Sequence, residues 1–263
     1  MSERIKRTFE KKEKKLVTFT TGGDPDLETS FSILKTIISN KIDIVEIGMP
    51  FSDPMADGPT IQESSTRSIE NGTIINDIFE LVKKIRSLNN EIPVILMGYY
   101  NSIFNMGIEE FTSKCVEVGV DGLIVVDLQP EEDEDLYLKT KEHNIDLIRL
   151  ITPTTDEERL KTILKNASGF LYYVTITGIT GQNSANLKEL ESSINLIRSE
   201  SNLPIVAGFG IKSRKDVENI STFTDGVVVG SSIVNIIKDN ISDKKSMLKK
   251  INSFTKDLKK GAV

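Results

Sequence analysis

Cysteine and histidine are almost absent from this sequence. It contains one cysteine, Cys115, and one histidine, His143. A single cysteine excludes an internal disulfide and is typical of a reducing compartment, and the helical pattern around Cys115 predicts a small buried side chain. A metal site would need carboxylate ligands alone, and we predict no metal site. His143 closes a predicted helix, where a capping or solvated role is expected.

Long apolar runs and a surplus of basic residues are absent as well. No segment approaches the roughly 18 consecutive apolar residues that a membrane span requires. The N-terminal stretch MSERIKRTFEKKEKK lacks the apolar core of a secretory signal. Acidic residues outnumber basic residues by 39 to 33, and the net charge of −6 argues against nucleic acid or an anionic membrane as a partner. We expect a cytoplasmic protein, or one of the plastid stroma if the source is a photosynthetic eukaryote.

Short apolar segments recur along the chain, and each is followed by a stretch with helical periodicity. Segments without polar alternation are typical of parallel strands that are buried on both faces. Eight such segments in 263 residues, with no break in composition between them, predict an α/β fold in which residues 1–263 form a single (β/α)8 barrel domain, or TIM barrel. The predicted strands cover residues 16–20, 42–47, 93–97, 122–127, 146–151, 169–174, 204–207 and 225–229.

The alternative fold is an open, doubly wound sheet. It usually has fewer strands and shows phosphate-binding glycines after the first strand, but Gly22 and Gly23 do not fit the GxGxxG pattern. An extra helix over the first dozen residues, with Ile5 and Phe9 on one face, is predicted to cover the bottom of the barrel. Other helices are expected over residues 27–39, 59–71, 74–88, 108–118, 131–143 and 187–200, from Asp156 onward, after GFGIKS, and after the eighth strand.

The second apolar segment contains a carboxylate, Glu46. A buried carboxylate is costly unless it is paired, hydrogen-bonded or neutralised. Strand periodicity places Glu46 on the same face as Ile44, and Asp57 follows on a Gly/Pro/Asp-rich loop that can fold over the barrel opening. Two carboxylates in different environments can serve as proton donor and acceptor in one reaction. The alternative is a salt-bridged structural glutamate with loop aspartates that cap turns.

Small residues follow the last three predicted strands, where barrels of this class commonly hold a phosphate. Gly181 follows the sixth strand, Gly210 the seventh, and Gly230 and Ser231 the eighth. Backbone N–H groups near the N-terminus of a helix suit a phosphate dianion. We therefore expect a phosphorylated substrate, although turns need glycine in any barrel.

Apolar and aromatic residues lie close to several predicted strand ends. Together they could line a pocket for a flat aromatic group, and the alternative role is barrel core. The segment 175–186 is long for a strand-to-helix connection, for which about 2 to 6 residues are usual, and is a candidate lid. The pocket candidates are Phe19, Ile61, Tyr99, Ile151, Tyr172 and Phe209.

Lysine is missing from the predicted strands and from the positions directly after them, except for Lys212 beyond the Gly210 turn. A Schiff-base aldolase mechanism therefore lacks its nucleophile. The basic run at positions 11–15 is interrupted by Glu13 and is expected to be a solvated face.

Several longer motifs occur in the order of a known family. The most specific is EIGMPFSDPMADGPTIQ, and it is supported by TTGGDPD, MGYYNSIFNMG, YYVTITGITG, AGFGIKS and VGSSIV. On these motifs the chain resembles the α subunits of tryptophan synthase over essentially its whole length. Departures are small: Ile176 stands where some relatives have a basic residue, and Val126 and Gln129 replace prolines often seen around Asp127.

The resemblance implies a reaction, the retro-aldol cleavage of indole-3-glycerol phosphate to indole and glyceraldehyde 3-phosphate. It implies that Glu46 gives a proton to indole C3 and takes one from the glycerol hydroxyl, and that Asp57 serves the indole nitrogen. It also implies substrate-binding roles for Asp127, for Tyr172, for Thr180 on a loop that closes against Asp57, and for a phosphate cradle of Gly181, Gly210, Gly230 and Ser231.

The resemblance further implies a partner. The expected assembly is α2β2, in which the β subunit carries pyridoxal phosphate and receives indole through a tunnel; no cofactor is expected in this chain. Two alternatives stay open: a stand-alone lyase that releases indole, and a catalytically silent subunit that activates β, against which the presence of both Glu46 and Asp57 counts. The residues on segments that would meet the β subunit are Asp53, Pro54, Asn101, Phe104 and Asn105.

Overall fold

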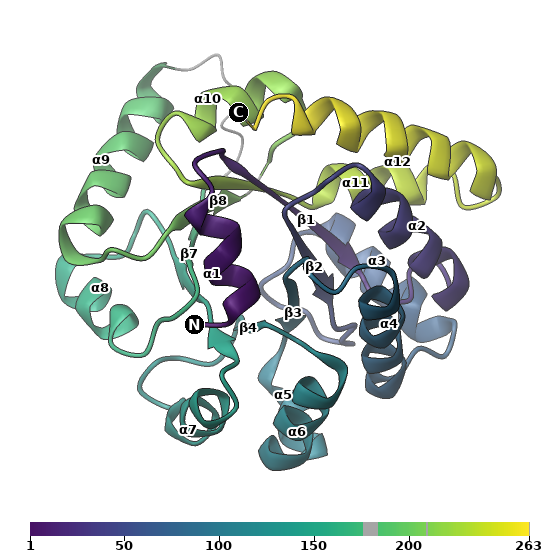
Figure 1. Ribbon diagram of the computed structural model, residues 1–263, viewed down its shortest axis with the longest axis horizontal. Coiled ribbons are helices and arrows are strands. Elements are labelled where there is room, and N and C mark those ends of the chain that lie inside the picture. Colours follow the sequence, from purple (N-terminus) through teal and green to yellow (C-terminus); the bar gives the residue numbers. More distant parts are fainter. Residues whose placement is uncertain (176–183, 209, 263) are drawn as a thin grey trace.

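The computed structural model describes residues 1–175, 184–208 and 210–262. In these residues nine parallel strands form one sheet. Figure 1 shows this sheet curved into a nearly closed barrel with helices around its outside. This arrangement confirms the predicted α/β barrel. The strands are β1 (Lys15–Thr21), β2 (Ile44–Gly48), β3 (Val94–Gly98), β4 (Gly122–Val125), β5 (Asp146–Leu147), β6 (Arg149–Ile151), β7 (Leu171–Val174), β8 (Ile205–Gly208) and β9 (Gly226–Val229).

The fifth predicted strand is divided in two. β5 pairs with β4, whereas β6 pairs with β7, so the segment 146–151 joins the two edges of the sheet. Ile148 lies between β5 and β6, and its side chain belongs to the apolar cluster inside the barrel. The nine strands therefore correspond to the eight predicted segments, because this one segment changes its partner at Ile148.

Helices surround the barrel because each apolar stripe packs against the outer face of the strands. Their bounds agree with the predictions to within a few residues, except for α5, which was not predicted. Seven residues are too few to show helical periodicity. The helices are α1 (Glu3–Glu10), α2 (Leu27–Ser39), α3 (Pro59–Glu70), α4 (Ile75–Leu88), α5 (Tyr100–Met106), α6 (Ile108–Val118), α7 (Glu134–Glu142), α8 (Glu157–Leu164), α9 (Ser184–Glu200), α10 (Arg214–Ser221), α11 (Ser231–Lys238) and α12 (Lys244–Lys259).

Side chains along the strands alternate between the inside and the outside of the barrel. Ile44 packs in the inner cluster, whereas Val45 and Ile47 pack in the larger cluster between the strands and the helices. Glu46 lies in register with Phe19 on β1 and has the same parity as Ile44, so its side chain faces inward. The predicted strand periodicity is therefore correct at the position that matters for the site.

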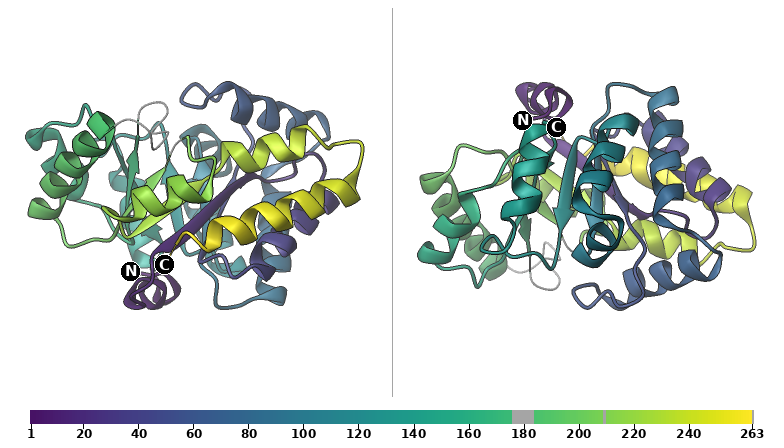
Figure 2. Two further views of the ribbon diagram at one scale, coloured as in Figure 1. Left: turned by 90° about the horizontal axis from the view of Figure 1, so that it is seen from above. Right: turned by 90° about the horizontal axis from the view of Figure 1, so that it is seen from below.

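Helix α1 closes the bottom of the barrel, as predicted. Ile5 is fully buried in the inner cluster, and the ring centroid of Phe9 lies 5.7 Å from that of Phe170. The Ser2 hydroxyl donates to Asp121 over 2.6 Å, and the Ser2 backbone N–H donates to Asp146 over 2.7 Å. Figure 2 shows α1 at one end of the barrel and the segment after β2, drawn in blue, toward the other.

The prediction about lysine was wrong at one position. Lys15 is the first residue of β1 and is 1% exposed, so it is neither outside the strands nor solvated. Its Nζ donates to the backbone oxygens of Lys11 and Glu13. Burial lowers the pKa of Lys15, against the charges of Asp43 and Glu13, which raise it. Because Lys15 lies at the N-terminal end of β1, it is far from the barrel mouth and cannot act as a nucleophile there.

Candidate active site

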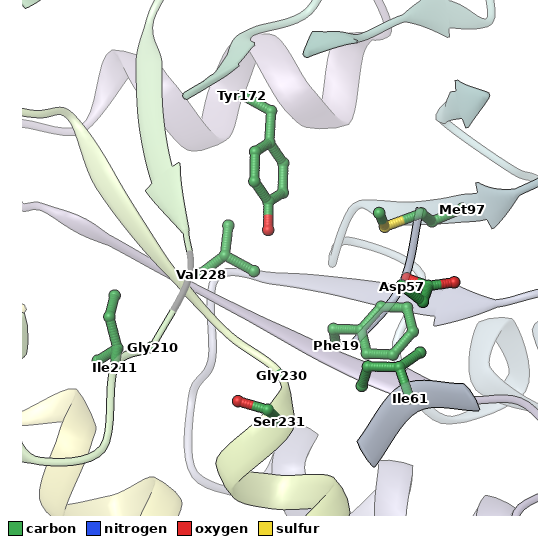
Figure 3. A pocket seen from close by; sticks show the side chains of 10 residues that line it. All are labelled: Phe19, Asp57, Ile61, Met97, Tyr172, Gly210, Ile211, Val228, Gly230 and Ser231. Atoms are coloured by element: carbon green, nitrogen blue, oxygen red, sulfur yellow. The ribbon is translucent and has the colours of Figure 1, made fainter. Parts of the chain in front are cut away.

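A cavity of about 540 Å³, part of it open to solvent, lies where the strands end and the following loops begin. Figure 3 shows the Tyr172 hydroxyl pointing into the cavity, with Asp57, Phe19 and Ile61 on one side and Gly210 and Ser231 on the other. The cavity is lined by Phe19, Asp57, Ile61, Met97, Tyr172, Gly210, Ile211, Val228, Gly230 and Ser231.

Glu46 is buried inside the barrel beside this cavity. Its side chain is 0% exposed, and neither carboxylate oxygen has a hydrogen-bond partner among the described residues. Burial disfavours the charged form and raises the pKa of Glu46 to about 8. The side chain is therefore mostly a neutral acid at pH 7. Such a group is prepared to donate a proton to a bound molecule and then to accept another.

Asp57 lies in the loop between β2 and α3 and lines the cavity. The Tyr99 hydroxyl donates to Asp57 Oδ2 over 2.9 Å. Burial raises the pKa of Asp57, and the hydrogen bond from Tyr99 opposes that rise. The two carboxylates thus differ in their hydrogen bonding, because Glu46 has no donor within the described part of the chain whereas Asp57 accepts a hydrogen bond from Tyr99.

Tyr172 projects inward from β7 and is 9% exposed. Burial and the charges of Glu46 and Asp57 raise the pKa of its hydroxyl well above the ordinary value, so the hydroxyl stays protonated. A Cβ atom at Gly208 would lie 2.4 Å from the Tyr172 hydroxyl oxygen. The glycine on β8 is therefore what leaves room for the tyrosine in the cavity.

The described residues that are predicted to bind phosphate lie on the side of the cavity opposite Asp57. Gly230 precedes α11, and the Gly230 oxygen accepts the N–H groups of Ile233 and Val234. The N-terminus of α11 begins at Ser231, which lines the cavity. Gly210 has a φ of 73°, a left-handed conformation that favours glycine. A helix N-terminus beside a glycine turn can hold an anion with its backbone N–H groups.

Other predicted site residues have different positions. Tyr99 lines a smaller adjoining cavity of about 320 Å³ that shares four lining residues with the first, namely Phe19, Asp57, Ile61 and Met97. Ile151 packs in the outer cluster between strands and helices, because its parity on β6 points it away from the barrel interior. Asp127 is exposed and accepts the N–H of Tyr100 over 2.7 Å at the start of α5. The structure therefore does not place Ile151 or Asp127 in the cavity.

Some predictions lie outside the described residues. These are Thr180, Gly181, Phe209, Ile176 and most of the candidate lid 175–186. Conversely, the sequence reasoning missed Met97, Ile211 and Val228, which line the cavity. Met97 and Val228 have the inward parity of their strands, and that parity could have identified them.

The residues expected to meet a partner lie after two neighbouring strands, β2 and β3. Asp53, Asn101 and Asn105 are exposed, and Phe104 is 67% exposed. Met55, which was not predicted, is 83% exposed on the same loop as Asp53. Large apolar side chains in solvent are typical of an interaction surface when they are grouped.

The described residues offer few other kinds of site. Lys212 is exposed, and its backbone N–H donates to Asp216. Within residues 1–175, 184–208 and 210–262, no three His, Cys, Asp or Glu side chains are grouped so that they could hold a metal ion. In the same ranges, no helix has both the length and the apolar character to cross a membrane.

The chain is similar to known proteins over nearly its full length. A sequence profile described as "Tryptophan synthase alpha chain" matches residues 5–263. A tryptophan synthase alpha chain from Petrotoga mobilis is 45% identical over 249 residues, which are 95% of this chain and 96% of that protein. Subunit alpha of tryptophan synthase from Legionella pneumophila has a TM-score of 0.92 at 35% identity, covering 100% of this chain and 98% of that one. Tryptophan synthase from Mycobacterium tuberculosis has a TM-score of 0.89 at 27% identity, covering 100% and 99%.

Proposed function

The chain belongs to the tryptophan synthase alpha chain family, and from this membership we propose that it cleaves indole-3-glycerol phosphate to indole and glyceraldehyde 3-phosphate. The observation that carries the proposal is a pair of unlike carboxylates: Asp57 lines a cavity that also meets the N-terminus of α11, and Glu46 is buried in the barrel beside it. The pair can move protons, and the helix end can hold the phosphate.

In the proposed reaction the bond between indole C3 and the neighbouring glycerol carbon breaks. Neutral Glu46 gives its proton to C3, and the ring becomes cationic at nitrogen. Ionised Asp57 accepts the N–H of the ring and stabilises that charge. Glu46, now ionised, takes the proton of the glycerol hydroxyl as the C–C bond breaks and the aldehyde forms, and the indole ring becomes neutral again. No net proton is gained or lost, which suits an acid with a pKa of about 8.

The cavity walls suit the two ends of this substrate. Phe19, Ile61 and Met97 offer apolar surface to a flat ring on the Asp57 side. On the other side, Gly210, Gly230 and Ser231 would hold the phosphate through backbone N–H groups. Because Glu46 is fully buried and does not line the cavity, the bound substrate must uncover it.

The proposed partner is a tryptophan synthase β chain, to which indole would pass. Tyr100 and Phe104, whose ring centroids lie 6.0 Å apart, and the exposed Met55 support a partner surface after β2 and β3. We assign pyridoxal phosphate to the partner and no cofactor to this chain. A chain that acts on a free phosphorylated metabolite is proposed to work in the cytoplasm.

An indole-release assay tests this proposal. The purified chain is incubated with indole-3-glycerol phosphate, with and without a tryptophan synthase β chain, and indole is measured. We expect slow release from the isolated chain and strong stimulation by the β chain. High turnover without stimulation would indicate a stand-alone lyase, and no turnover in either condition would contradict the proposed activity.

A further inference from the structure

The loop between β2 and α3 carries Asp57 and is held at both of its ends by side chains from other elements. One is Ser65 on α3, and the other is Tyr99 at the end of β3. Between these two attachments the loop is exposed at Ser52, Asp53 and Met55. The position of Asp57 therefore depends on these attachments more than on packing of the loop itself.

Ser65 fixes the first end of the loop. Its hydroxyl accepts the backbone N–H of Phe51 over 2.7 Å and donates to the backbone oxygen of Phe51 over 2.9 Å. Ser65 is 5% exposed, so water competes little for these bonds. One side chain thus satisfies both backbone groups of the residue at which the loop begins.

Tyr99 fixes the second end. Its ring stacks on the ring of Phe51, with centroids 5.2 Å apart and an interplanar angle of 26°. Its hydroxyl oxygen accepts the N–H of Ala56 over 3.0 Å, and its one hydrogen is donated to Asp57 over 2.9 Å. Because the Ala56 N–H can only donate, the hydrogen of the Tyr99 hydroxyl must point toward Asp57. A hydrogen bond donated to the carboxylate favours the ionised form of Asp57.

These contacts form a continuous series from Ser65 through Phe51 and Tyr99 to Asp57. We propose that Ser65 and Tyr99 are positioning residues that brace the loop 51–57 and hold ionised Asp57 where it receives the indole N–H. The proposal rests on the proposed lyase function. It adds a role for Ser65, and it assigns the Tyr99 hydroxyl to Asp57 rather than to the substrate.

The contact with Tyr99 opposes the effect of burial on the pKa of Asp57. Burial raises the pKa of Asp57, and the bond from Tyr99 lowers it. The other titratable side chains of the pocket are Glu46 on β2 and Tyr172 on β7, and both stay mostly neutral at pH 7. Asp127 lies near enough to Tyr99 for its charge to raise the pKa of that hydroxyl. The described residues that face Asp57 therefore include no cation, and Tyr99 is its main stabilising donor.

The first variant is Tyr99→Phe, which keeps the ring stack and removes the hydroxyl. The pH profile of kcat/KM for indole release has an acid limb that reflects ionisation of Asp57 in the free enzyme. Without the donor the pKa of Asp57 rises, so the limb moves to higher pH, and kcat/KM at pH 7 falls by about tenfold or more. An unchanged limb and unchanged kcat/KM would overturn the role of Tyr99.

The second variant is Ser65→Ala, and Ser68→Ala is its matched control. Ser68 is a fully buried serine one turn further along α3, and its hydroxyl donates to the Gly22 oxygen over 2.7 Å, away from the loop. Both variants lose buried hydrogen bonds, but only Ser65→Ala releases Phe51. We expect Ser65→Ala to lower kcat/KM by about three- to tenfold and to move the acid limb in the same direction as Tyr99→Phe, since one loosened donor bond has about that effect. Ser68→Ala should leave the profile unchanged.

Amide hydrogen exchange provides a readout that does not depend on activity. The N–H groups of Phe51 and Ala56 should be protected in the wild-type chain and lose protection in Ser65→Ala and Tyr99→Phe, respectively, but not in Ser68→Ala. Failure of the lyase proposal would appear as no indole from the wild-type chain with or without the β chain. Failure of the brace would appear as active wild type together with Ser65→Ala and Ser68→Ala profiles that superimpose.

Discussion

Carboxylates at the two ends of the barrel differ in their hydrogen-bond and charge partners. At the bottom, Asp121 is 2% exposed and accepts from Ser2, Arg4, Arg86 and the backbone N–H of Val94. At the mouth, Glu46 has no partner within the described residues, and Asp57 has one neutral hydroxyl donor. Asp121 and Glu46 belong to the same fold and are both almost completely buried.

The difference distinguishes acids that stabilise the fold from the acids that we propose to act in catalysis. A carboxylate that is surrounded by cations and N–H groups is fixed in its ionised form and ties elements together. A buried carboxylate without such partners costs free energy in the ionised form, and the fold gains nothing from it. Asp121 thus joins α1 and α4 to the strands, whereas Glu46 is free to exchange a proton. The comparison predicts that changes at the mouth affect catalysis and changes at the bottom affect stability.

The largest expected effect is on catalysis by Glu46. Glu46→Gln keeps the shape of the side chain and removes the exchangeable acid, so indole release should fall by about 10³-fold or more, because two proton transfers are lost. Steady-state assays with the β chain present measure this loss. Thermal unfolding should show a variant at least as stable as the wild type. Wild-type activity in Glu46→Gln would remove Glu46 from the mechanism.

At the bottom of the barrel, Asp121→Asn should lower stability and leave catalysis nearly unchanged. The variant leaves Arg86, whose side chain is 10% exposed, without its charge partner. Removing one member of a buried pair costs about 3 kcal/mol in the free energy of unfolding. Urea unfolding measures that loss, and kcat at 25 °C should stay within about twofold of the wild type, because the site is at the other end of the strands. A large fall in kcat with little loss of stability would break the comparison.

Asp57→Ala is expected to have the next largest effect, again on catalysis. Loss of the group that stabilises the ring nitrogen should reduce kcat for indole release by about 10²-fold. Asp57 is only partly buried and has one neutral hydroxyl donor, which predicts a change in unfolding free energy of about 1 kcal/mol or less. Parallel activity and unfolding measurements distinguish these outcomes, and an unfolding loss as large as that of Asp121→Asn would place Asp57 among the structural acids.

A further expected effect concerns the pH dependence of stability. The native state holds a proton on Glu46 up to about pH 8, whereas the unfolded chain loses it near the ordinary glutamate pKa of about 4.3. The native state therefore binds more protons between these values, and this contribution to stability is complete below the lower value and is lost as pH rises toward 8. Relative to the wild type, Glu46→Gln should become progressively more stable between pH 5 and pH 8, by up to about 1.4 kcal/mol for each pH unit. If the free energies of unfolding of the wild type and Glu46→Gln changed with pH in the same way across this range, the result would contradict the unpaired state of Glu46.

Much of the fold could be predicted from the sequence because apolar runs mark buried parallel strands. The face of Glu46 followed from its parity with Ile44. Two details could not be predicted this way. The change of partner at Ile148 depends on how the barrel closes, and the inclusion of Lys15 in β1 depends on carbonyl oxygens of the preceding turn that bind its Nζ. That residues 1–263 form one domain stays a prediction.

The positions of the candidate site residues were predictable where chemistry and position coincide. Glu46 and Asp57 are acids at one strand end, and glycines mark the helix end at α11. The brace was not predictable, because a serine on a helix such as Ser65 carries no signal of the distant backbone that it binds. Ile151 and Asp127 show the converse: each lies next to a strand end, but parity directs Ile151 outward and Asp127 binds the start of α5.

Titration of the Glu46 carboxyl tests most directly whether the two acids at the mouth differ in protonation. Infrared difference spectra between the wild type and Glu46→Gln isolate the carbonyl stretch of a protonated carboxyl. The structure predicts a band that is present at pH 6 and disappears with a midpoint near pH 8. A midpoint near the ordinary glutamate value, with Glu46 ionised at pH 6, would contradict the proposed division of roles between Glu46 and Asp57.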